Sequence, residues 1–411
     1  MNTYLDKKFA EFNQQNIPYN PKLDTQVKQE KKDLATKYAA VLQSRSLSEA
    51  DTYYLGMLNH LTGNGDDALE AMRRFLATGA ATGENAQIAR AVLVLYTTRN
   101  DLIPEAERAV ADFAKNQPQN LIEWFGMETL ITDAWQKSKD YERMLKHALE
   151  MYKIALLVTS DKKLNSFKRD ELLFKSVSLI SDALVQLNKR EAAIAAVSEL
   201  RKLAIAIPSG NLLRFANIRL AGLDRSMDPR GIFDEVSSAT GQLPDIVATQ
   251  WIDQAPVKLS ELRGQVVLLD FWAHWCGPCR YTFPKLQRWH ESYKDKGLVI
   301  LGVTNYFGHV EGRKVTRAEE LAYLRSFKKT NRLPYGFVVS DSGINDMNYG
   351  VFSIPMSFLI DREGKVRYIS LGVNHQELAA LDKRIQQLFA ESPGHATNAT
   401  TDSNGAKNNQ R

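Results

Sequence analysis

Both cysteines of this 411-residue chain stand in one short segment, 275–279, whose sequence is WCGPC. The residues before it, 265–273, form a short apolar run that is β-branched at its start, which is typical of a buried central strand. The residues after it, 281–293, repeat apolar side chains at spacings of three and four, as an amphipathic helix does. The sequence therefore predicts that the cysteines lie at a strand-to-helix turn.

The order of the two thiols indicates different roles. Cys276 falls at the start of the predicted helix, where unpaired backbone N–H groups and the helix dipole favour a thiolate. We therefore predict Cys276 as the nucleophile. Cys279 follows one helical turn later, close enough to attack a mixed disulfide at Cys276 and release the reduced partner, so we predict it as the resolving thiol.

Two other interpretations of the pair are weaker. A zinc site usually has four ligands, and the chain has no further cysteine and no histidine pair at ligand spacing in this region, so we expect no metal. A structural disulfide would close a very small ring and would constrain the unfolded chain little. Redox chemistry is favoured, with the disulfide Cys276–Cys279 itself in place of a cofactor.

The segment 270–280, which reads DFWAHWCGPCR, resembles the active site of thioredoxin-fold proteins. The resemblance implies that Trp275, Gly277 and Pro278 support the cysteines. The Gly-Pro pair is the thioredoxin dipeptide, which in thioredoxins accompanies a reducing potential of roughly −270 mV. His274, next to Trp275, could add a titratable charge near the thiolate, although an exposed histidine at the edge of a loop is more often incidental.

A second segment, 348–366, resembles a signature of the thiol:disulfide oxidoreductases related to TlpA and ResA. In that family the bond between Ile354 and Pro355 would be cis and would lie beside the cysteines. The backbone of Ile354 would then be free to pair with an extended substrate segment. An ordinary edge-strand proline is the alternative. With the entry strands before the first motif, the resemblance spans about 243–389.

One departure from that family concerns the proton acceptor. Several members carry a glutamate three residues after the second cysteine, where this chain has Thr282, whereas Asp270 matches the buried acid of thioredoxins. An aspartate beneath Cys279 can accept the proton of that thiol as it attacks, and burial would raise the pKa of the carboxyl toward the working pH. We predict Asp270 as the proton acceptor. A hydrogen-bonded core acid without a proton role is the alternative.

Upstream of these motifs, apolar residues recur at helical spacing from about residue 34 to residue 223. The predicted helices come in pairs, and their turns recur at drifting intervals close to those of helical-hairpin repeats. This pattern resembles a degenerate tetratricopeptide-like array, which would present a concave surface to a protein partner. An irregular helical bundle is the alternative.

The chain is therefore predicted to be multidomain, with an all-α, repeat-like N-terminal domain and a C-terminal α/β thioredoxin fold. We place the helical domain at 31–225, a polar linker at 226–241 and the thioredoxin-like domain at 242–391. Residues 1–30 are weakly patterned and are expected to be weakly ordered. Residues 392–411 are rich in Asn, Thr, Ser and Gly, and we expect them to be disordered.

Charge and composition narrow the partners and the location. A net charge of +5 on 411 residues, with Lys and Arg spread along the chain, argues against nucleic acid. No phosphate-binding glycine loop is apparent, so we expect electrons to arrive from a protein dithiol. The sequence has no apolar signal core and no stretch long enough to span a membrane, which favours the cytoplasm. The resemblance instead implies the bacterial cell envelope, with an export signal absent from this chain.

Together these features predict a thiol:disulfide oxidoreductase that reduces or exchanges disulfides in protein partners recruited partly by the helical domain. The stretch 305–336 is longer than a minimal thioredoxin needs and is expected to border the substrate groove or to be a solvated insertion. A peroxiredoxin-like thiol peroxidase is one alternative function, but Ala273 stands where that class needs a hydroxyl residue. A helical-repeat binding or chaperone protein with an accessory thioredoxin module is the other. The sequence does not identify the client, the electron donor, the direction of transfer or the oligomeric state.

Overall fold

The computed structural model of the chain describes residues 2–18, 20–78, 81–159, 165–224, 243–341 and 343–391. The chain forms two compact units. The first comprises residues 1–164 and 171–196, and the second comprises residues 165–170 and 197–411. The predicted linker, 226–241, and the predicted tail, 392–411, lie outside the described residues, so the domain boundaries stay predictions.

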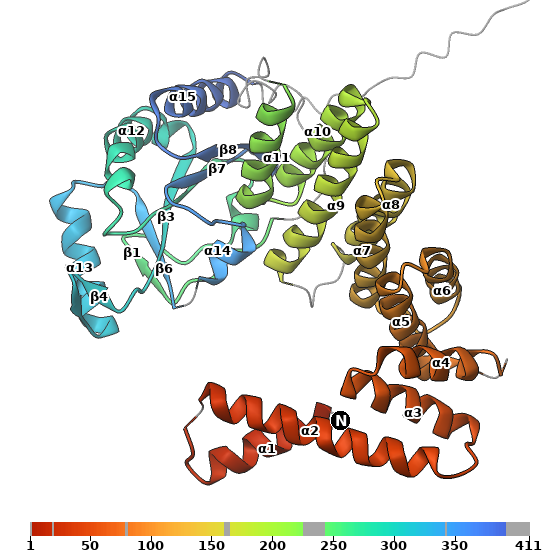
Figure 1. Ribbon diagram of the computed structural model, residues 1–411. Helices are drawn as coiled ribbons and strands as arrows, with labels where there is room; N and C mark the ends of the chain where they lie inside the picture. Colours follow the sequence, from red (N-terminus) through yellow and green to blue (C-terminus); the bar gives the residue numbers. More distant parts are fainter. Residues whose placement is uncertain are drawn as a thin grey trace, which may run out of the picture. The chain divides into compact units, whose positions relative to one another are not determined.

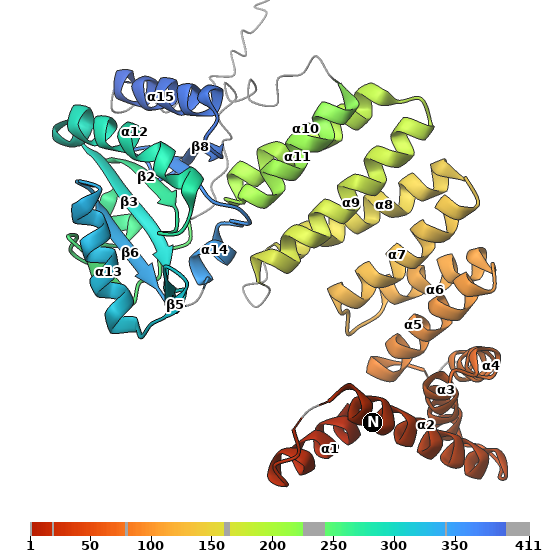
Figure 2. The ribbon, with the colours of Figure 1, turned by 60° about the vertical axis from the view of Figure 1, so that its left-hand side comes forward.

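The first unit consists of helices that follow one another along the chain (Figures 1 and 2). Consecutive helices pack in pairs, α3 with α4, α5 with α6 and α7 with α8. The helices are α1 (Asn2–Gln14), α2 (Pro21–Gln43), α3 (Glu49–Thr62), α4 (Gly65–Leu76), α5 (Gly83–Arg99), α6 (Ile103–Lys115), α7 (Leu121–Lys137) and α8 (Tyr141–Val158), followed by parts of α9 (Ser166–Gln186) and α10 (Arg190–Ala206).

Local sequence explains why the first helices form where they do. Residues up to 30, for which the sequence predicted weak order, carry α1 and the start of α2. Asn20 caps α2, since its side-chain oxygen accepts a hydrogen bond from the backbone N–H of Leu23. Helix α3 ends at Gly63, whose φ of 87° is the left-handed conformation that glycine adopts without strain. Such caps satisfy backbone groups at the helix ends, so the connections between the helices can be short.

The second unit contains a mixed six-stranded sheet in the order β1-β6-β3-β2-β7-β8. Its strands are β1 (Gln250–Ile252), β2 (Val266–Phe271), β3 (Leu298–Asn305), β6 (Gly336–Ser340), β7 (Met356–Ile360) and β8 (Val366–Leu371). A separate hairpin pairs β4 (His309–Val310) with β5 (Arg313–Lys314). The helices of this unit include α11 (Gly210–Leu223), α12 (Gly277–Tyr293), α13 (Arg317–Thr330), α14 (Ile344–Asn348) and α15 (His375–Ala390), with short 3-10 turns η1 (Leu259–Leu262) and η2 (Lys294–Lys296).

Strand β2 lies in the middle of this sheet, parallel to β3 and antiparallel to β7. Every residue of β2 is buried, as expected from its apolar sequence. Helix α12 connects β2 to β3, and it lies beside α15, since the Trp289 indole donates a hydrogen bond to Asp382 at 2.6 Å (Figure 1). A parallel β2-α12-β3 unit followed by the antiparallel strands β7 and β8 and a final helix is a thioredoxin-like fold. The predicted fold class is confirmed: helices in the N-terminal part and an α/β thioredoxin fold in the C-terminal part.

Candidate active site

The two cysteines lie at the strand-to-helix turn that the sequence predicted. They form a disulfide, with their Cα atoms 5.3 Å apart. Cys276 is the N-cap residue of α12, and its Sγ accepts a hydrogen bond from the backbone N–H of Cys279 at 3.1 Å. A backbone donor at a helix N-terminus stabilises negative charge on a sulfur, so this geometry favours the Cys276 thiolate once the disulfide is opened.

Exposure distinguishes the two sulfur-bearing residues further. Cys279 is fully buried, whereas Cys276 retains 3% exposure and follows Trp275, which is 53% exposed. Pro278 lies in the first turn of α12, where its missing N–H leaves no hydrogen bond unmade. Both cysteines are therefore buried, and Trp275 next to Cys276 provides exposed surface at the turn.

Asp270 lies on β2, the strand that leads into this turn, and is fully buried. The Ser357 hydroxyl donates a hydrogen bond to its Oδ1 at 2.8 Å, while Oδ2 has no hydrogen-bond partner among the residues that the structure describes. Burial raises the pKa of Asp270 to about 6, although the hydrogen bond from Ser357 lowers it. A carboxyl with this pKa can gain or lose a proton near neutral pH.

Thr282, which stands where several members of the resembled family carry a glutamate, cannot replace Asp270 in this role. Its side chain is buried, and its hydroxyl donates a hydrogen bond to the backbone carbonyl of Cys279 at 2.7 Å. A threonine hydroxyl is not a base near neutral pH, and this one is bonded to the backbone of its own helix.

Pro355 lies at the same edge of the sheet as the cysteine turn. Met356 begins β7 and pairs with Phe271, the last residue of β2, so the residue before β7 and the residues after β2 emerge together. The Ile354–Pro355 peptide bond is cis. Pro355 is buried, whereas Phe352, two residues before Ile354, is 58% exposed.

His274 is buried rather than exposed, which differs from the expectation based on its position in a loop. Its ring is 2% exposed, and Nε2 lies 3.6 Å from a carboxylate oxygen of Glu320, which is fully buried on α13. Burial lowers the pKa of His274 more than the Glu320 charge raises it. Because its pKa is lowered, the imidazole is mostly neutral at neutral pH, so it adds little positive charge beside the cysteines.

Glu320 also holds the stretch that the sequence left as either a groove border or an insertion. Its two carboxylate oxygens accept the backbone N–H groups of Phe307 (2.8 Å) and Gly308 (2.9 Å). The Phe307 ring lies 5.3 Å from the Trp275 ring and 5.8 Å from the His274 ring, measured between centroids. The segment before β4 therefore packs against the cysteine turn.

Sequence analysis did not identify Glu320, although a signal was present. Glu320 precedes Leu324 by four residues and Phe327 by seven, and both are buried on α13. An acid in phase with the apolar face of a helix must find buried polar partners, and here it finds two backbone N–H groups and an imidazole.

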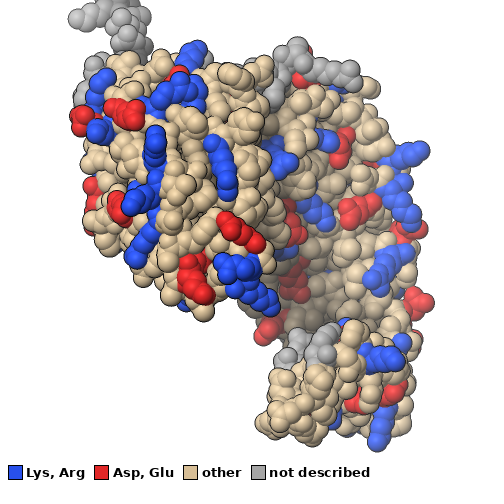
Figure 3. All heavy atoms as spheres, turned by 90° about the vertical axis from the view of Figure 1, so that its left-hand side faces the viewer, with Lys and Arg blue, Asp and Glu red and all other residues tan. Residues whose placement is uncertain are grey.

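Surface charge, possible metal ligands and helix hydrophobicity bear on what the protein could bind. On the face in Figure 3, Lys and Arg are interspersed with Asp and Glu, unlike the single-sign surface that favours a polyanion. Within the described ranges, no group of three or more His, Cys, Asp or Glu side chains is placed to hold a metal ion. None of the helices that the structure describes is both long and apolar enough to cross a membrane.

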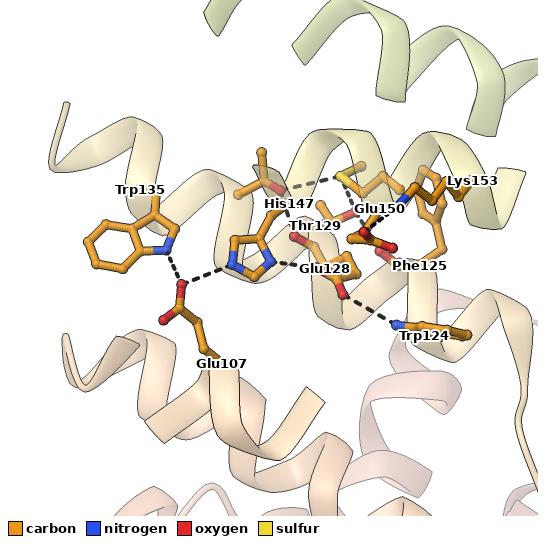
Figure 4. Close-up of polar contacts among 11 residues, drawn as sticks. Glu107, Trp124, Phe125, Glu128, Thr129, Trp135, His147, Glu150 and Lys153 are labelled. Carbon is orange, nitrogen blue, oxygen red and sulfur yellow. Dashed lines mark hydrogen bonds and ion pairs between the residues drawn. The ribbon is translucent and has the colours of Figure 1, made fainter. Parts of the chain in front are cut away.

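A second buried cluster lies in the helical unit, around His147 of α8 (Figure 4). Its Nδ1 is 2.6 Å from Glu128 of α7, and its Nε2 is 2.9 Å from Glu107 of α6. The indoles of Trp124 and Trp135 donate hydrogen bonds to the same two carboxylates. Burial alone would lower the pKa of His147, but the two carboxylates outweigh it and the pKa is raised. The cluster connects three helices by charge-assisted hydrogen bonds.

Comparison with known proteins places the similarity in the C-terminal unit. The AhpC/TSA family model matches residues 240–369, which include the cysteines and Pro355. Thioredoxin-like protein YneN of Bacillus subtilis is 29% identical over 138 residues, which are 34% of this chain and 75% of YneN. Thiol-disulfide oxidoreductase ResA of Bacillus cereus (strain ATCC 10987) is 29% identical over 126 residues, which are 30% of this chain and 65% of ResA.

Two further similarities also cover about a third of the chain. Protein DipZ of Mycobacterium tuberculosis is 32% identical over 139 residues, and the chain spans only 19% of DipZ. The crystal structure of a thiol:disulfide interchange protein DsbE from Chlorobium tepidum has 32% sequence identity and a TM-score of 0.31, and the match covers 36% of this chain and 95% of that chain. The family model thus matches the unit that carries the disulfide, and ResA, one of these relatives, is named a thiol-disulfide oxidoreductase.

Proposed function

We propose that the protein is a thiol-disulfide oxidoreductase that reduces or exchanges disulfides in protein partners. In the reduced protein, the Cys276 thiolate attacks a partner disulfide, forms a mixed disulfide and expels one partner thiolate. Asp270 then accepts the proton of the Cys279 thiol, and Cys279 attacks Sγ of Cys276. The Cys276–Cys279 disulfide forms, the second partner thiolate leaves, and two electrons have moved to the partner.

The observation that carries this proposal is the position of Asp270. A fully buried carboxyl with a pKa of about 6 lies on the strand that ends at the disulfide, and one of its oxygens has no partner within the described part of the chain. Charged carboxyls are rarely kept in such an environment without a task, because burial without compensation is costly. The proposal needs no cofactor beyond the cysteine pair.

The test is to trap the mixed disulfide. Cys279→Ser should accumulate a covalent complex with a protein disulfide substrate, because nothing remains to release the partner from Cys276. Cys276→Ser should be inactive and should trap nothing. Mass spectrometry of the complex under non-reducing conditions identifies the bonded residue, and trapping through Cys279 instead would reverse the assigned roles.

We propose a reducing direction, with electrons supplied by a protein dithiol. The Gly-Pro dipeptide between the cysteines supports this, since thioredoxins with that dipeptide have potentials of roughly −270 mV. Equilibration with glutathione buffers, followed by thiol alkylation and mass spectrometry, measures the potential. A value near that of the oxidant DsbA, about −120 mV, would reverse the proposed direction.

Substrate binding is proposed at the segment of Ile354 and Pro355, where an extended peptide could pair with the backbone of Ile354. Trp275, Gly277 and Pro278 would support the cysteines from the other side. The pairing of Phe271 with Met356 supports this proposal, because the segment after β2 and the segment before β7 then emerge at one edge of the sheet.

We further propose that the helical unit recruits partners in the manner of a repeat array, and that the protein works in the bacterial cell envelope. The helix pairs of the first unit support recruitment. A fragment that begins at Asn165 should reduce a small disulfide at the full-length rate but lose preference for a natural partner. Undiminished preference would assign recognition to residues from 165 onward. Cell fractionation of the source bacterium tests the location.

A further inference from the structure

The loop 349–355, which leads into the cis bond, is contacted by helical segments that precede the thioredoxin sheet in the sequence. These segments, 165–170 and the start of α11, belong to the same compact unit as the sheet. The backbone N–H of Gly210, the first residue of α11, donates a hydrogen bond to the carbonyl of Tyr349 at 3.0 Å. The start of α11 is thus bonded to the start of the loop.

A glycine on each side allows a close approach at this contact. A Cβ on Gly210 would overlap the Sδ atom of Met356, the residue that follows Pro355. Gly350 has a φ of 57°, and a Cβ there would lie 2.5 Å from the Ser209 hydroxyl oxygen. The backbone of Gly210 therefore lies against the Met356 side chain, and the backbone of Gly350 lies against the Ser209 side chain, with no room for a Cβ atom unless the neighbour moves.

The helical side of the contact is rigid. The Ser209 hydroxyl donates a hydrogen bond to Oδ2 of Asp170 at 2.5 Å and accepts the N–H of Leu212 at 3.1 Å. Asp170 is 1% exposed, and its other oxygen lies 2.7 Å from the Arg169 guanidinium. A fully buried serine with both hydrogen-bonding roles filled holds the start of α11 in one position.

The exposed side of the loop is contacted as well. Phe167 stacks on Phe352, with centroids 5.7 Å apart and an interplanar angle of 29°. The Arg214 guanidinium donates to the Ser353 hydroxyl at 3.2 Å. Phe352 and Ser353 directly precede Ile354, so these contacts reach the residues next to the cis bond.

We infer that Gly210 is a positioning residue for substrate binding, and that α11 with segment 165–170 fixes the loop 349–355 in the conformation that receives a peptide. The inference rests on the proposed function, because that function places the substrate backbone along Ile354. It assigns the helical region a direct role at the reaction site: the loop conformation, and with it recognition of an extended protein disulfide, depends on residues outside the thioredoxin fold itself.

The test compares two glycines of one helix in the full-length protein. Gly210→Ala inserts a methyl group at the contact with Met356, whereas Gly222→Ala, near the end of α11, meets nothing within 4 Å. Gly210→Ala should lower kcat/KM for reduction of insulin, a protein disulfide, by about 10- to 100-fold, chiefly through KM. Reduction of a small aromatic disulfide and the redox potential should stay unchanged, and Gly222→Ala should match wild type in all three.

Phe167→Ala, a change at an exposed ring, covers the case in which Gly210→Ala fails to fold. It should raise KM for insulin by about threefold through loss of the ring stack. The inference is overturned if Gly210→Ala matches Gly222→Ala on insulin, if it lowers both substrates equally, or if it fails to fold and Phe167→Ala leaves KM unchanged. Failure of wild type to reduce the small disulfide would instead refute the proposed function.

Discussion

Replacing Asp270 with asparagine should stabilise the thioredoxin sheet and slow the reaction at the same time. Burial raises the pKa of Asp270 from its ordinary value of 3.8 to about 6. The folded protein therefore favours the protonated acid, and ionisation of Asp270 in the folded state lowers the free energy of unfolding. Asparagine keeps the shape and the acceptor for the Ser357 hydroxyl but carries no charge.

The size of this effect follows from the pKa. The gap between 3.8 and about 6 is worth about 3 kcal/mol at neutral pH. Because the folded-state pKa is raised, the stability that protonation contributes is fully present below about pH 3.8 and is lost as the pH rises through about 6. The increase in the free energy of unfolding caused by Asp270→Asn should therefore be nearly complete at pH 7, about half as large at pH 5 and small near pH 4.

Hydrogen exchange of peptides covering β2 and β7 measures this free energy for the sheet alone, which avoids assuming that both units unfold together. Turnover with a protein disulfide, measured in parallel, should fall by about 100-fold at neutral pH because Cys279 loses its proton acceptor. Stability and activity should thus change in opposite directions.

Asp361→Asn provides the matched control. This carboxylate is also buried, but its Oδ1 accepts the N–H groups of Glu363 (3.0 Å) and Lys365 (2.9 Å), and its Oδ2 lies 3.3 Å from Arg367. The same substitution there removes a compensated charge and should destabilise the sheet. A loss of stability in Asp270→Asn, or a gain independent of pH, would refute the reasoning about burial. If Asp270→Asn turns over a protein disulfide as fast as wild type from about pH 6 to 9, Asp270 has no role in the mechanism.

Two further predictions concern the buried polar clusters. Glu320→Gln should speed hydrogen exchange at the amides of Phe307 and Gly308, because one carboxylate oxygen that accepts these amides is replaced by a donor. Glu319→Gln is the control, since its side chain can still cap α13, and it should not speed that exchange. Equal protection of the two amides in both variants would show that the Glu320 carboxylate does not hold that segment. His147→Gln should cost the helical unit about 3–5 kcal/mol, because it leaves a buried carboxylate without its charged partner. Since the pKa of His147 is raised, the stability that its charged form contributes is fully present below the ordinary value of 6.5 and is lost as the pH rises through the raised pKa. Urea unfolding of the wild-type protein should show this decline. A wild-type protein without the decline, or a His147→Gln variant with wild-type stability, would contradict the role given to His147.

The parts of the site that the sequence predicted are those encoded within a few adjacent residues. The apolar run of β2, the cysteine spacing and the helical periodicity after Tyr281 all act locally, and the structure has β2 and α12 where they were expected. Asp270 could be singled out because it matches the buried acid of thioredoxins, and it stands within an apolar strand. A charge in such a strand has to be buried.

The remaining features depend on contacts between distant segments. His274 and Glu320 are far apart in sequence, and a histidine in a loop carries no local sign that an acid from α13 will bury it. Gly210 looks like any glycine near a helix start, and only the approach of Met356 makes it restrictive. Tertiary contacts of this kind override local expectation, because burial is a property of the whole fold.

The active site is thus fixed from two directions by residues that do no chemistry. Glu320 holds the segment before β4 against Trp275, and Gly210 holds the loop before Pro355. Fixed flanks reduce what each substrate must organise on binding. Since neither Glu320 nor Gly210 takes part in the proposed sulfur chemistry, substitutions there should alter substrate choice while the redox potential stays constant.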